Sequence, residues 1–277
     1  MKKTVVAICY DFDNTLSVSD MQSFSFIPNL DMNVGDFWGK INGYAKENKM
    51  DGILSYLYFM IDFCKKKNIK LTKEYLKSLG KDIVYFNGVK TWFDRINNYA
   101  EKKNIEVEHY IITSGNREII EGSEIFDKCK EVFGCEYLYD ENGEAIWPKN
   151  IVNYTQKTQF LFRICKGAYD ISDEKTVNQR IKKRHVEFRN MIYMGDGLTD
   201  VPCLTLIKEK GGNSIAIYKP ETKEISDKLI KENRVNFACL GDFGENSQVE
   251  NLVKLIIDTI YYKEKLIEKE RKLKKST

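Results

Sequence analysis

Two carboxylates stand one residue apart directly after an apolar run near the start of the chain. The run, residues 5–10, is rich in β-branched side chains and predicts a strand that is buried on both faces. Asp11 and Asp13 follow it, and the chain then turns at Asn14. Two acids at this spacing on an extended backbone can divide nucleophilic attack and proton transfer between them. Because open parallel sheets bind ligands at the carboxyl ends of their strands, we expect chemistry here.

A second apolar run ends in a hydroxyl group and a glycine. Residues 111–115 have the sequence Ile-Ile-Thr-Ser-Gly and predict a strand that finishes at Ser114 and Gly115. The hydroxyl group, and the amide N–H groups after it at the start of a helix, are donors suited to an anion. Taken alone, these two residues would indicate an ordinary turn.

A third apolar run leads into two further acids. Residues 191–194 predict a strand, and the segment Gly-Asp-Gly-Leu-Thr-Asp after it places acids at Asp196 and Asp200. The glycines on either side of Asp196 permit a tight turn and a close approach of the backbone to an ion or a substrate. Asp200 alone is equally consistent with a helix N-cap.

Lys157 lies between the second and third of these runs, near the start of an amphipathic helix that the sequence predicts over residues 159–165. A lysine at this place can supply a fixed positive charge. Lys149 and Lys166 are alternatives because they are near in the sequence, but Lys157 has the better position at a helix start.

Taken in chain order, the four segments resemble the four motifs of the haloacid dehalogenase (HAD) superfamily of phosphotransferases. The motifs are Asp-x-Asp-x-Thr, Ser-Gly, a lysine on a helix and Gly-Asp-Gly-x-x-Asp. The resemblance covers roughly residues 4–16 and 89–245. It implies a magnesium-dependent enzyme built on a Rossmann-like parallel sheet.

The resemblance also implies a role for each residue. Asp11 is the nucleophile and forms an aspartyl-phosphate, while Asp13 protonates the leaving oxygen and later takes a proton from the attacking water. Thr15 fixes the loop through a hydrogen bond. The phosphoryl group is bound by three further residues, Ser114, Gly115 and Lys157.

A magnesium site is the other implication. Mg²⁺ prefers oxygen ligands, and the resemblance provides them from Asp196, the carboxylate of Asp11 and the main-chain carbonyl group of Asp13. Asp200 would orient water or Lys157 rather than bind the metal ion.

Alternating strands and helices predict an α/β fold with a doubly wound, parallel sheet. Residues 17–88 differ, because helical periodicity recurs there and no sheet-like strand is evident. The resemblance implies that this insert after the first strand is a helical cap over the active site, as in the phosphoserine-phosphatase-like branch. We therefore predict a HAD-like catalytic core of residues 1–16 and 89–277 and a helical cap of residues 17–88.

Local patterns predict the remaining elements. Helices are expected over residues 53–64, 73–79 after an N-cap at Thr72, 91–103, 117–133 and from 248 to the end. Strands are expected over residues 214–218 and 235–240, and a hairpin over residues 137–147 around Asn142-Gly143. His109 is expected at a strand edge and His185 on a loop surface.

The composition favours a cytoplasmic enzyme. The 44 basic and 41 acidic residues leave a net charge of +3, which does not indicate a nucleic-acid partner. The seven cysteines include no C-x-x-C pair, so neither a zinc site nor a disulfide framework is indicated. No stretch approaches the roughly 20 apolar residues of a membrane helix, and no cleavage site follows the short apolar run at the start.

These observations predict a Mg²⁺-dependent phosphatase that hydrolyses a small phosphorylated metabolite, with its oligomeric state left open. A phosphomutase or another phosphotransferase on the same core is an alternative, and a phosphonatase would use a lysine of the cap. A dehalogenase would lack Asp13, and a non-catalytic phosphate-binding or scaffold protein would have lost Asp11 or Asp13.

The predicted cap contains no arginine, because the first arginine of the chain is Arg95. The phosphoserine phosphatases that the chain resembles bind the amine and carboxylate of serine with an acid after the first motif and a cap arginine. Asp20 could supply the acid. A lysine cannot replace the planar guanidinium fork, so we expect L-phosphoserine to be a poor substrate.

Overall fold

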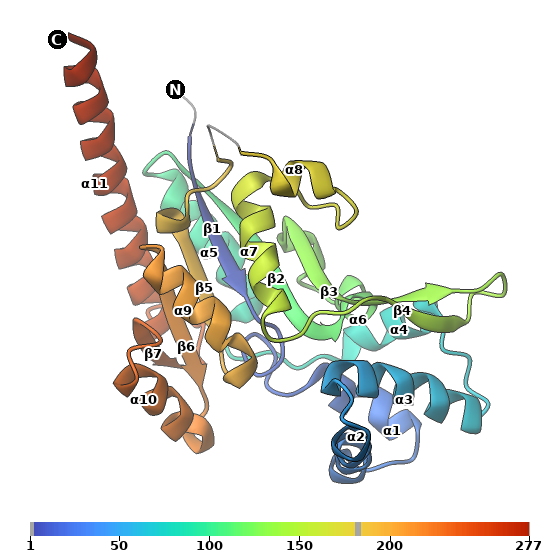
Figure 1. The fold of residues 1–277 in the computed structure, drawn as a ribbon. Coiled ribbons are helices and arrows are strands. Elements are labelled where there is room, and N and C mark those ends of the chain that lie inside the picture. Colours follow the sequence, from blue (N-terminus) through green and yellow to red (C-terminus); the bar gives the residue numbers. More distant parts are fainter. Residues whose placement is uncertain (1–2, 181–183, 277) are drawn as a thin grey trace.

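The computed structural model describes residues 3–180 and 184–276. Its centre is a seven-stranded sheet with the strand order β4-β3-β2-β1-β5-β6-β7 (Figure 1). Neighbouring strands run parallel, except that the edge strand β4 is antiparallel to β3. The strands are β1 (Thr4–Tyr10), β2 (Ile105–Asn116), β3 (Glu131–Tyr139), β4 (Ala145–Asn150), β5 (Met191–Gly195), β6 (Asn213–Tyr218) and β7 (Phe237–Leu240).

Helices cover both faces of this sheet, which confirms the predicted doubly wound α/β fold. Helix α5 packs on β2 and α11 on β1 and β7, whereas α9 packs on β5, β6 and α7. The helices are α1 (Phe26–Asn29), α2 (Val34–Asn48), α3 (Gly52–Lys66), α4 (Lys73–Leu79), α5 (Val89–Glu101), α6 (Arg117–Glu121), α7 (Gln156–Lys166), α8 (Glu174–Asn178), α9 (Val201–Glu209), α10 (Lys223–Lys231) and α11 (Gln248–Ser276).

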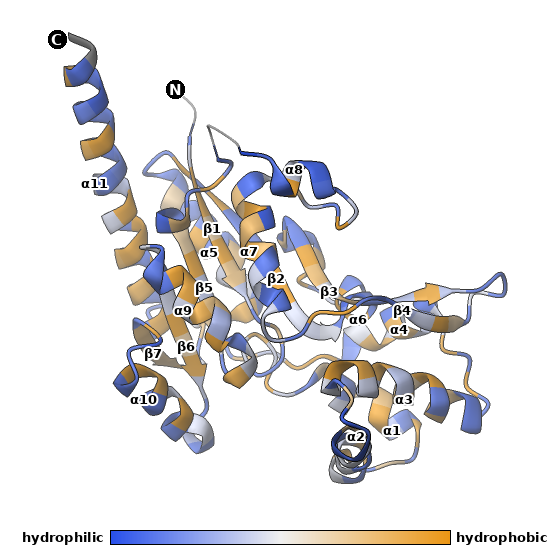
Figure 2. Ribbon diagram, in the orientation of Figure 1, coloured by the Kyte–Doolittle hydropathy of each residue, from blue (hydrophilic) through white to orange (hydrophobic). Residues whose placement is uncertain are grey.

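The central strands are apolar because both of their faces are covered. Figure 2 shows this as orange strands in the middle of the molecule, whereas α10 and α11 alternate between blue and orange. In the part of the chain that the structure describes, no helix combines the length and the apolar character that crossing a bilayer requires.

Strand β1 brings the predicted site residues together. It pairs with β2 on one side and β5 on the other, so these three strands end at the same edge of the sheet. The backbone N–H of Asp11 donates to the carbonyl oxygen of Met194 at 2.8 Å, which extends the pairing by one residue past β1. The first acid is therefore fixed to the neighbouring strand.

The segment between β1 and β2 is helical, as its periodicity predicts. Asn33, Asp51 and Thr72 each accept a backbone N–H and cap the starts of α2, α3 and α4. Helices α1, α2 and α3 form one group (Figure 1). The hydroxyl group of Tyr56 in α3 donates to the carbonyl oxygen of Ser114 at 2.6 Å, so this group contacts the carboxyl end of β2.

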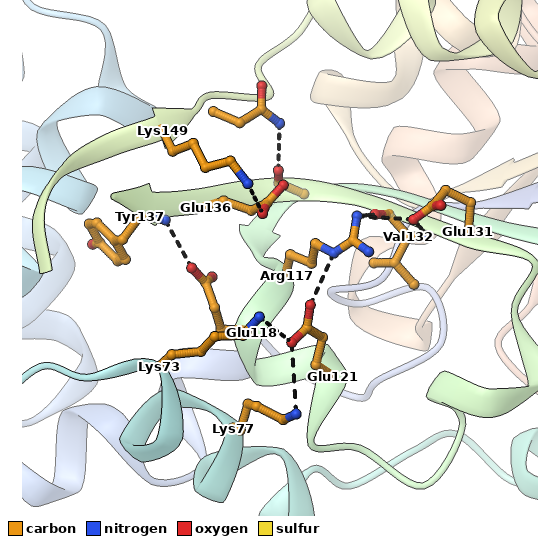
Figure 3. A network of polar contacts seen from close by, with 12 residues as sticks. Lys73, Lys77, Arg117, Glu118, Glu121, Glu131, Val132, Glu136, Tyr137 and Lys149 are labelled. Atoms are coloured by element: carbon orange, nitrogen blue, oxygen red, sulfur yellow. Dashed lines mark hydrogen bonds and ion pairs between the residues drawn. The ribbon is translucent and has the colours of Figure 1, made fainter. Parts of the chain in front are cut away.

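Ion pairs hold helix α4 against α6, the helix that directly follows β2. Lys73 and Lys77 of α4 pair with Glu121 of α6, which also accepts from Arg117 (Figure 3). A Cβ atom on Gly122 would lie 1.7 Å from the carbonyl oxygen of Lys77, so only glycine permits this approach. The segment after β1 therefore packs against the sheet-bearing part through α3 and through α4.

The helix predicted over residues 117–133 is wrong. Helix α6 ends at Glu121, and β3 begins at Glu131. The close approach of Gly122 to α4 ends the helix, and Val132 and Phe133 pair in parallel with β2. The hairpin predicted after this point is confirmed, since Tyr139 of β3 lies opposite Ala145 of β4, and Gly143 has a φ of 75° in the turn.

His109 lies in the interior of the sheet and not at a strand edge, because β2 is flanked by β1 and β3. Its side chain is buried in a chain of hydrogen bonds. Trp92 Nε1 donates to Tyr10 Oη at 2.8 Å, Tyr10 Oη is 2.9 Å from His109 Nδ1, and His109 Nε2 is 3.0 Å from Asn97 Oδ1. Tyr10 can donate to Nδ1 only if His109 is neutral with its proton on Nε2.

This geometry predicts a pH-dependent stability. Burial lowers the pKa of His109 to about 3 from 6.5, so the unfolded chain binds more protons than the folded protein between these values. The contribution of His109 to stability should therefore fall with decreasing pH, by about 1.4 kcal/mol per pH unit below 6.5. Urea unfolding between pH 7 and pH 4.5 measures this slope. The variant His109→Gln should show a shallower slope, and an equal slope in both proteins would contradict the assignment.

Candidate active site

Lys157 joins two acids at the carboxyl edge of the sheet. Its ammonium group lies 2.9 Å from Asp11 Oδ1 and 2.7 Å from Asp200 Oδ1, and all three side chains are buried. Lys157 is in the first turn of α7, as the sequence predicts. The alternatives lie elsewhere, because Lys149 pairs with Glu136 and Lys166 donates to the carbonyl oxygens of Val177 and Gln179.

Asp200 reaches Lys157 because of two features of β5. A Cβ atom on Gly195 would lie 2.5 Å from Asp200 Cγ, so glycine at the strand end leaves the room that the carboxylate occupies. Tyr193 of β5 donates its hydroxyl group to Asp200 Oδ1 at 2.7 Å. The side chain of Asp200 does not cap α9. The N-cap alternative that its sequence position allowed is therefore excluded for that helix.

Negative charge exceeds positive charge in this cluster. Burial raises the pKa of Asp11 to about 7, and the charge of Asp200 adds to the rise while Lys157 opposes it. The pKa of Asp196 rises to about 8 through burial and through the charges of Asp11 and Asp200. Burial disfavours the charged form of Lys157, but the two acids bonded to it outweigh this effect and raise its pKa. One lysine therefore faces three acids.

This donor set fits a divalent cation. Asp11, Asp196 and Asp200 each present a carboxylate oxygen within 4.8 Å of the others, and two of the three residues are buried. Hard oxygen donors and excess negative charge are what Mg²⁺ requires. Lys157 is bonded to both Asp11 and Asp200, so its single charge balances only part of the negative charge of the three acids.

Asp13 has a different environment from Asp11. Its Oδ1 accepts the backbone N–H of Met21 at 2.9 Å, and its pKa is raised well above the usual value by burial and then by the charges of Asp20 and Asp11. The backbone at Asn14 is left-handed, with a φ of 59°. Burial and the two neighbouring acids therefore favour the protonated form of Asp13.

A short network fixes the loop after Asp13. Asn14 donates from Nδ2 to Asp20 Oδ1 at 3.2 Å and accepts from Lys219 Nζ at 2.9 Å. Burial raises the pKa of Asp20, while Asn14, Lys219 and Trp38 each lower it. These contacts place Asp20, and the segment 20–23 that begins with it, next to Asp13.

The end of β2 presents a hydroxyl group with a free hydrogen-bonding capacity. Ser114 Oγ is buried and has no partner among the described residues, which is unusual for a buried hydroxyl group. The amide of Gly115 donates to Thr113 Oγ1 at 2.9 Å. A Cβ atom on Gly115 would lie 2.2 Å from the methyl carbon of Met21, so this glycine allows the segment 20–23 to cover the strand end.

Thr15 hydrogen-bonds within the loop through its backbone, because its N–H donates to the carbonyl oxygen of Phe12 at 3.2 Å. Its buried hydroxyl group has no partner among the described residues. The sequence reasoning missed three residues that shape the site, namely Tyr193, Met21 and Tyr56. A tyrosine within the apolar run before Gly195-Asp196 was the one signal available for Tyr193.

A relative in sequence covers most of the chain, although no protein-family model matches it. An uncharacterized protein of Borreliella burgdorferi is 29% identical over 273 residues, which cover 88% of this chain and 92% of that protein.

Two solved structures extend the comparison. A HAD family hydrolase of Salmonella enterica serovar Typhi superposes with a TM-score of 0.59 at 18% identity, over 90% of this chain and 70% of that chain. A phosphoserine phosphatase with an analogue of its phospho-aspartyl intermediate gives a TM-score of 0.52 at 16% identity, over 91% and 99% of the two chains. These likenesses show that the chain has the fold of the HAD superfamily, in the form that phosphoserine phosphatases share.

Proposed function

We propose that the protein is a phosphatase that hydrolyses a small phosphate monoester through an aspartyl-phosphate on Asp11. The observation that carries the proposal is the contrast between the two acids of the first motif. Asp11 is bonded to a buried ammonium group, which opposes the rise that burial and Asp200 cause and leaves its pKa at about 7. Asp13 has no cation bonded to it among the described residues, and its pKa is raised well above the usual value. One acid is suited to attack and the other to give a proton.

The reaction has two steps at these residues. A carboxylate oxygen of Asp11 attacks phosphorus, and the bond from phosphorus to the leaving oxygen breaks as Asp13 gives its proton to that oxygen. Water then attacks the phosphorus of the aspartyl-phosphate, Asp13 takes the proton of that water, and phosphate leaves. Ser114 Oγ, which lacks a partner within the described residues, and Lys157 are the groups that we assign to the phosphoryl oxygens.

We propose Mg²⁺ as the cofactor, held by the carboxylates of Asp11 and Asp196 and by the main-chain carbonyl group of Asp13. When bound, the ion neutralises charge on the phosphoryl oxygens. We also propose that residues 17–88 form the cap of a core made by residues 1–16 and 89–277. Tyr56 on Ser114 and Met21 over Gly115 support this, because both bring that segment onto the site.

Asp20 supports a substrate class. Its carboxylate lies close enough to Asp13 for its charge to raise the pKa of that acid, which puts it on the side where the leaving group would sit. The segment 17–88 has no arginine, and Arg95 is bonded to Glu250 and to the carbonyl oxygen of Phe243. A leaving group with a positive charge and no carboxylate fits this environment.

The variant Asp11→Asn tests the function directly. Because the aspartyl-phosphate forms on Asp11, this variant should lose phosphatase activity by about 10³-fold or more. Phosphate release from an aryl phosphate with Mg²⁺ measures the rate, and mass spectrometry after acid quenching locates the phosphoryl group. The exposed acid Asp127 gives a matched control, Asp127→Asn, which should retain full activity. An active Asp11→Asn protein would refute the mechanism.

Metal binding can be tested without any assay of activity. In metal-free buffer at pH 8.5, the variant Asp196→Asn should be more stable than the wild type by about 1–3 kcal/mol, because it removes one of three mutually repelling charges, of which the other two are buried. Mg²⁺ should raise the unfolding temperature of the wild type and of Asp127→Asn but not of Asp196→Asn. An equal response of all three proteins in thermal unfolding would exclude this site.

The substrate class leads to a comparison of two esters. O-Phosphoethanolamine and L-phosphoserine both carry an amine, but only phosphoserine also carries a carboxylate. That carboxylate would lie near Asp20, and the segment 17–88 offers no guanidinium group to bind it. We expect kcat/KM for phosphoethanolamine to exceed that for phosphoserine by about tenfold or more. The variant Asp20→Asn should reduce this ratio. A preference for L-phosphoserine would contradict the inference while leaving the phosphatase reaction intact.

A further inference from the structure

Helix α11 carries an apolar stripe on the side that faces away from the protein. Its inner face, with Val253, Ile257 and Ile260, is buried against the body. Leu255, Tyr262 and Leu266 lie on the outer side and are 63%, 64% and 71% exposed. At 100° per residue, these three positions fall within about 40° of one another and opposite the buried face.

The spacing of the stripe is that of a coiled-coil seam. Positions 255, 259, 262, 266, 269 and 273 alternate in steps of four and three residues and hold Leu, Thr, Tyr, Leu, Lys and Leu. This is the a and d pattern of a heptad repeat. Lys269 occupies one of these positions, and a single lysine in a coiled-coil seam specifies the register of the two helices at some cost in stability.

The last turns of α11 extend away from the rest of the molecule (Figure 1). Buried side chains of the helix reach as far as Ile260, and Arg189 pairs with Glu264 one turn later. The remaining stretch is about the length at which an isolated helix is marginal in water. Pairs within the helix such as Lys274 with Glu270 give limited support. A partner on the apolar stripe would supply the missing packing.

We propose that two copies of this chain associate through the outer face of α11 as a parallel, two-stranded coiled coil. The charges beside the seam select this orientation. In a parallel pair, Lys265 of one chain faces Glu270 of the other, so opposite charges meet on both sides of the seam. An antiparallel pair with aligned seams would set Lys265 against Lys265 and Lys263 against Lys263.

The arrangement is sterically simple. Because the stripe and the buried face lie on opposite sides of α11, the two bodies would stand on the outside of the helix pair. Each chain would use the same surface, as a closed two-fold dimer requires. The site at Asp11 would remain open in both chains, since Figure 1 shows the last turns of α11 and the helices α1 to α3 at opposite ends of the molecule.

Sedimentation velocity of the full chain over a range of concentrations tests this proposal. We expect a concentration-dependent dimer in the wild type and a monomer in the double variant Tyr262→Glu, Leu266→Glu. Trp147 on β4 is equally exposed at 62%, so Trp147→Glu is the matched control and should still dimerise. Helix content by circular dichroism checks that each variant is folded. A monomeric wild type, or a dimer that the double variant does not weaken, would overturn the proposal.

Charge exchange tests the parallel orientation. The single variants Lys265→Glu and Glu270→Lys should each weaken the dimer by roughly tenfold, because each sets like charges opposite one another in both halves of the pair. The double variant Lys265→Glu, Glu270→Lys restores opposite charges and should return the dissociation constant close to that of the wild type. Single variants without effect, or a double variant weaker than both, would refute the parallel coil.

Discussion

The site depends on one ammonium group that is buried between two carboxylates. Lys157 comes from α7, Asp11 from the end of β1 and Asp200 from the turn before α9, so the contact joins three elements that are far apart in the sequence. A buried charge without its partner costs about 3–5 kcal/mol. The order of β1 and β5 in the sheet, the glycine at position 195 and the first turn of α7 must therefore all be correct together.

Burial is the second constraint, and it acts on both acids of the first motif in different ways. Loss of water raises the pKa of both acids, and neighbouring carboxylates add to the rise in each case, but only Asp11 has a cation, Lys157, that opposes it. The segment 20–23 provides much of this burial, since Met21 covers Gly115 and donates its N–H to Asp13. The segment after β1 is thus part of the electrostatics of the site and not merely a cover.

The sequence predicted those parts that local patterns determine. Short apolar runs identified β1 and β5, and the Asn142-Gly143 pair identified the turn between β3 and β4, because backbone preference and burial act there over a few residues. The helix predicted over 117–133 failed where a tertiary contact decides, since the approach of α4 to Gly122 ends α6. The contacts of Tyr193 and Met21 were out of reach for the same reason, because each depends on a residue that only the fold brings near.

Net charge is a poor guide to where this molecule can make contacts. A value of +3 for the whole chain conceals a site with three acids around one lysine and a helix whose charges alternate beside an apolar stripe. Both features arise from position: parallel strand ends collect acids at one edge of the sheet, and a helix longer than the body it packs on carries its outer face into solvent. Because the two features lie at opposite ends of the molecule, association through α11 would leave the chemistry at Asp11 unchanged in each chain, and the two sites of a dimer would act independently.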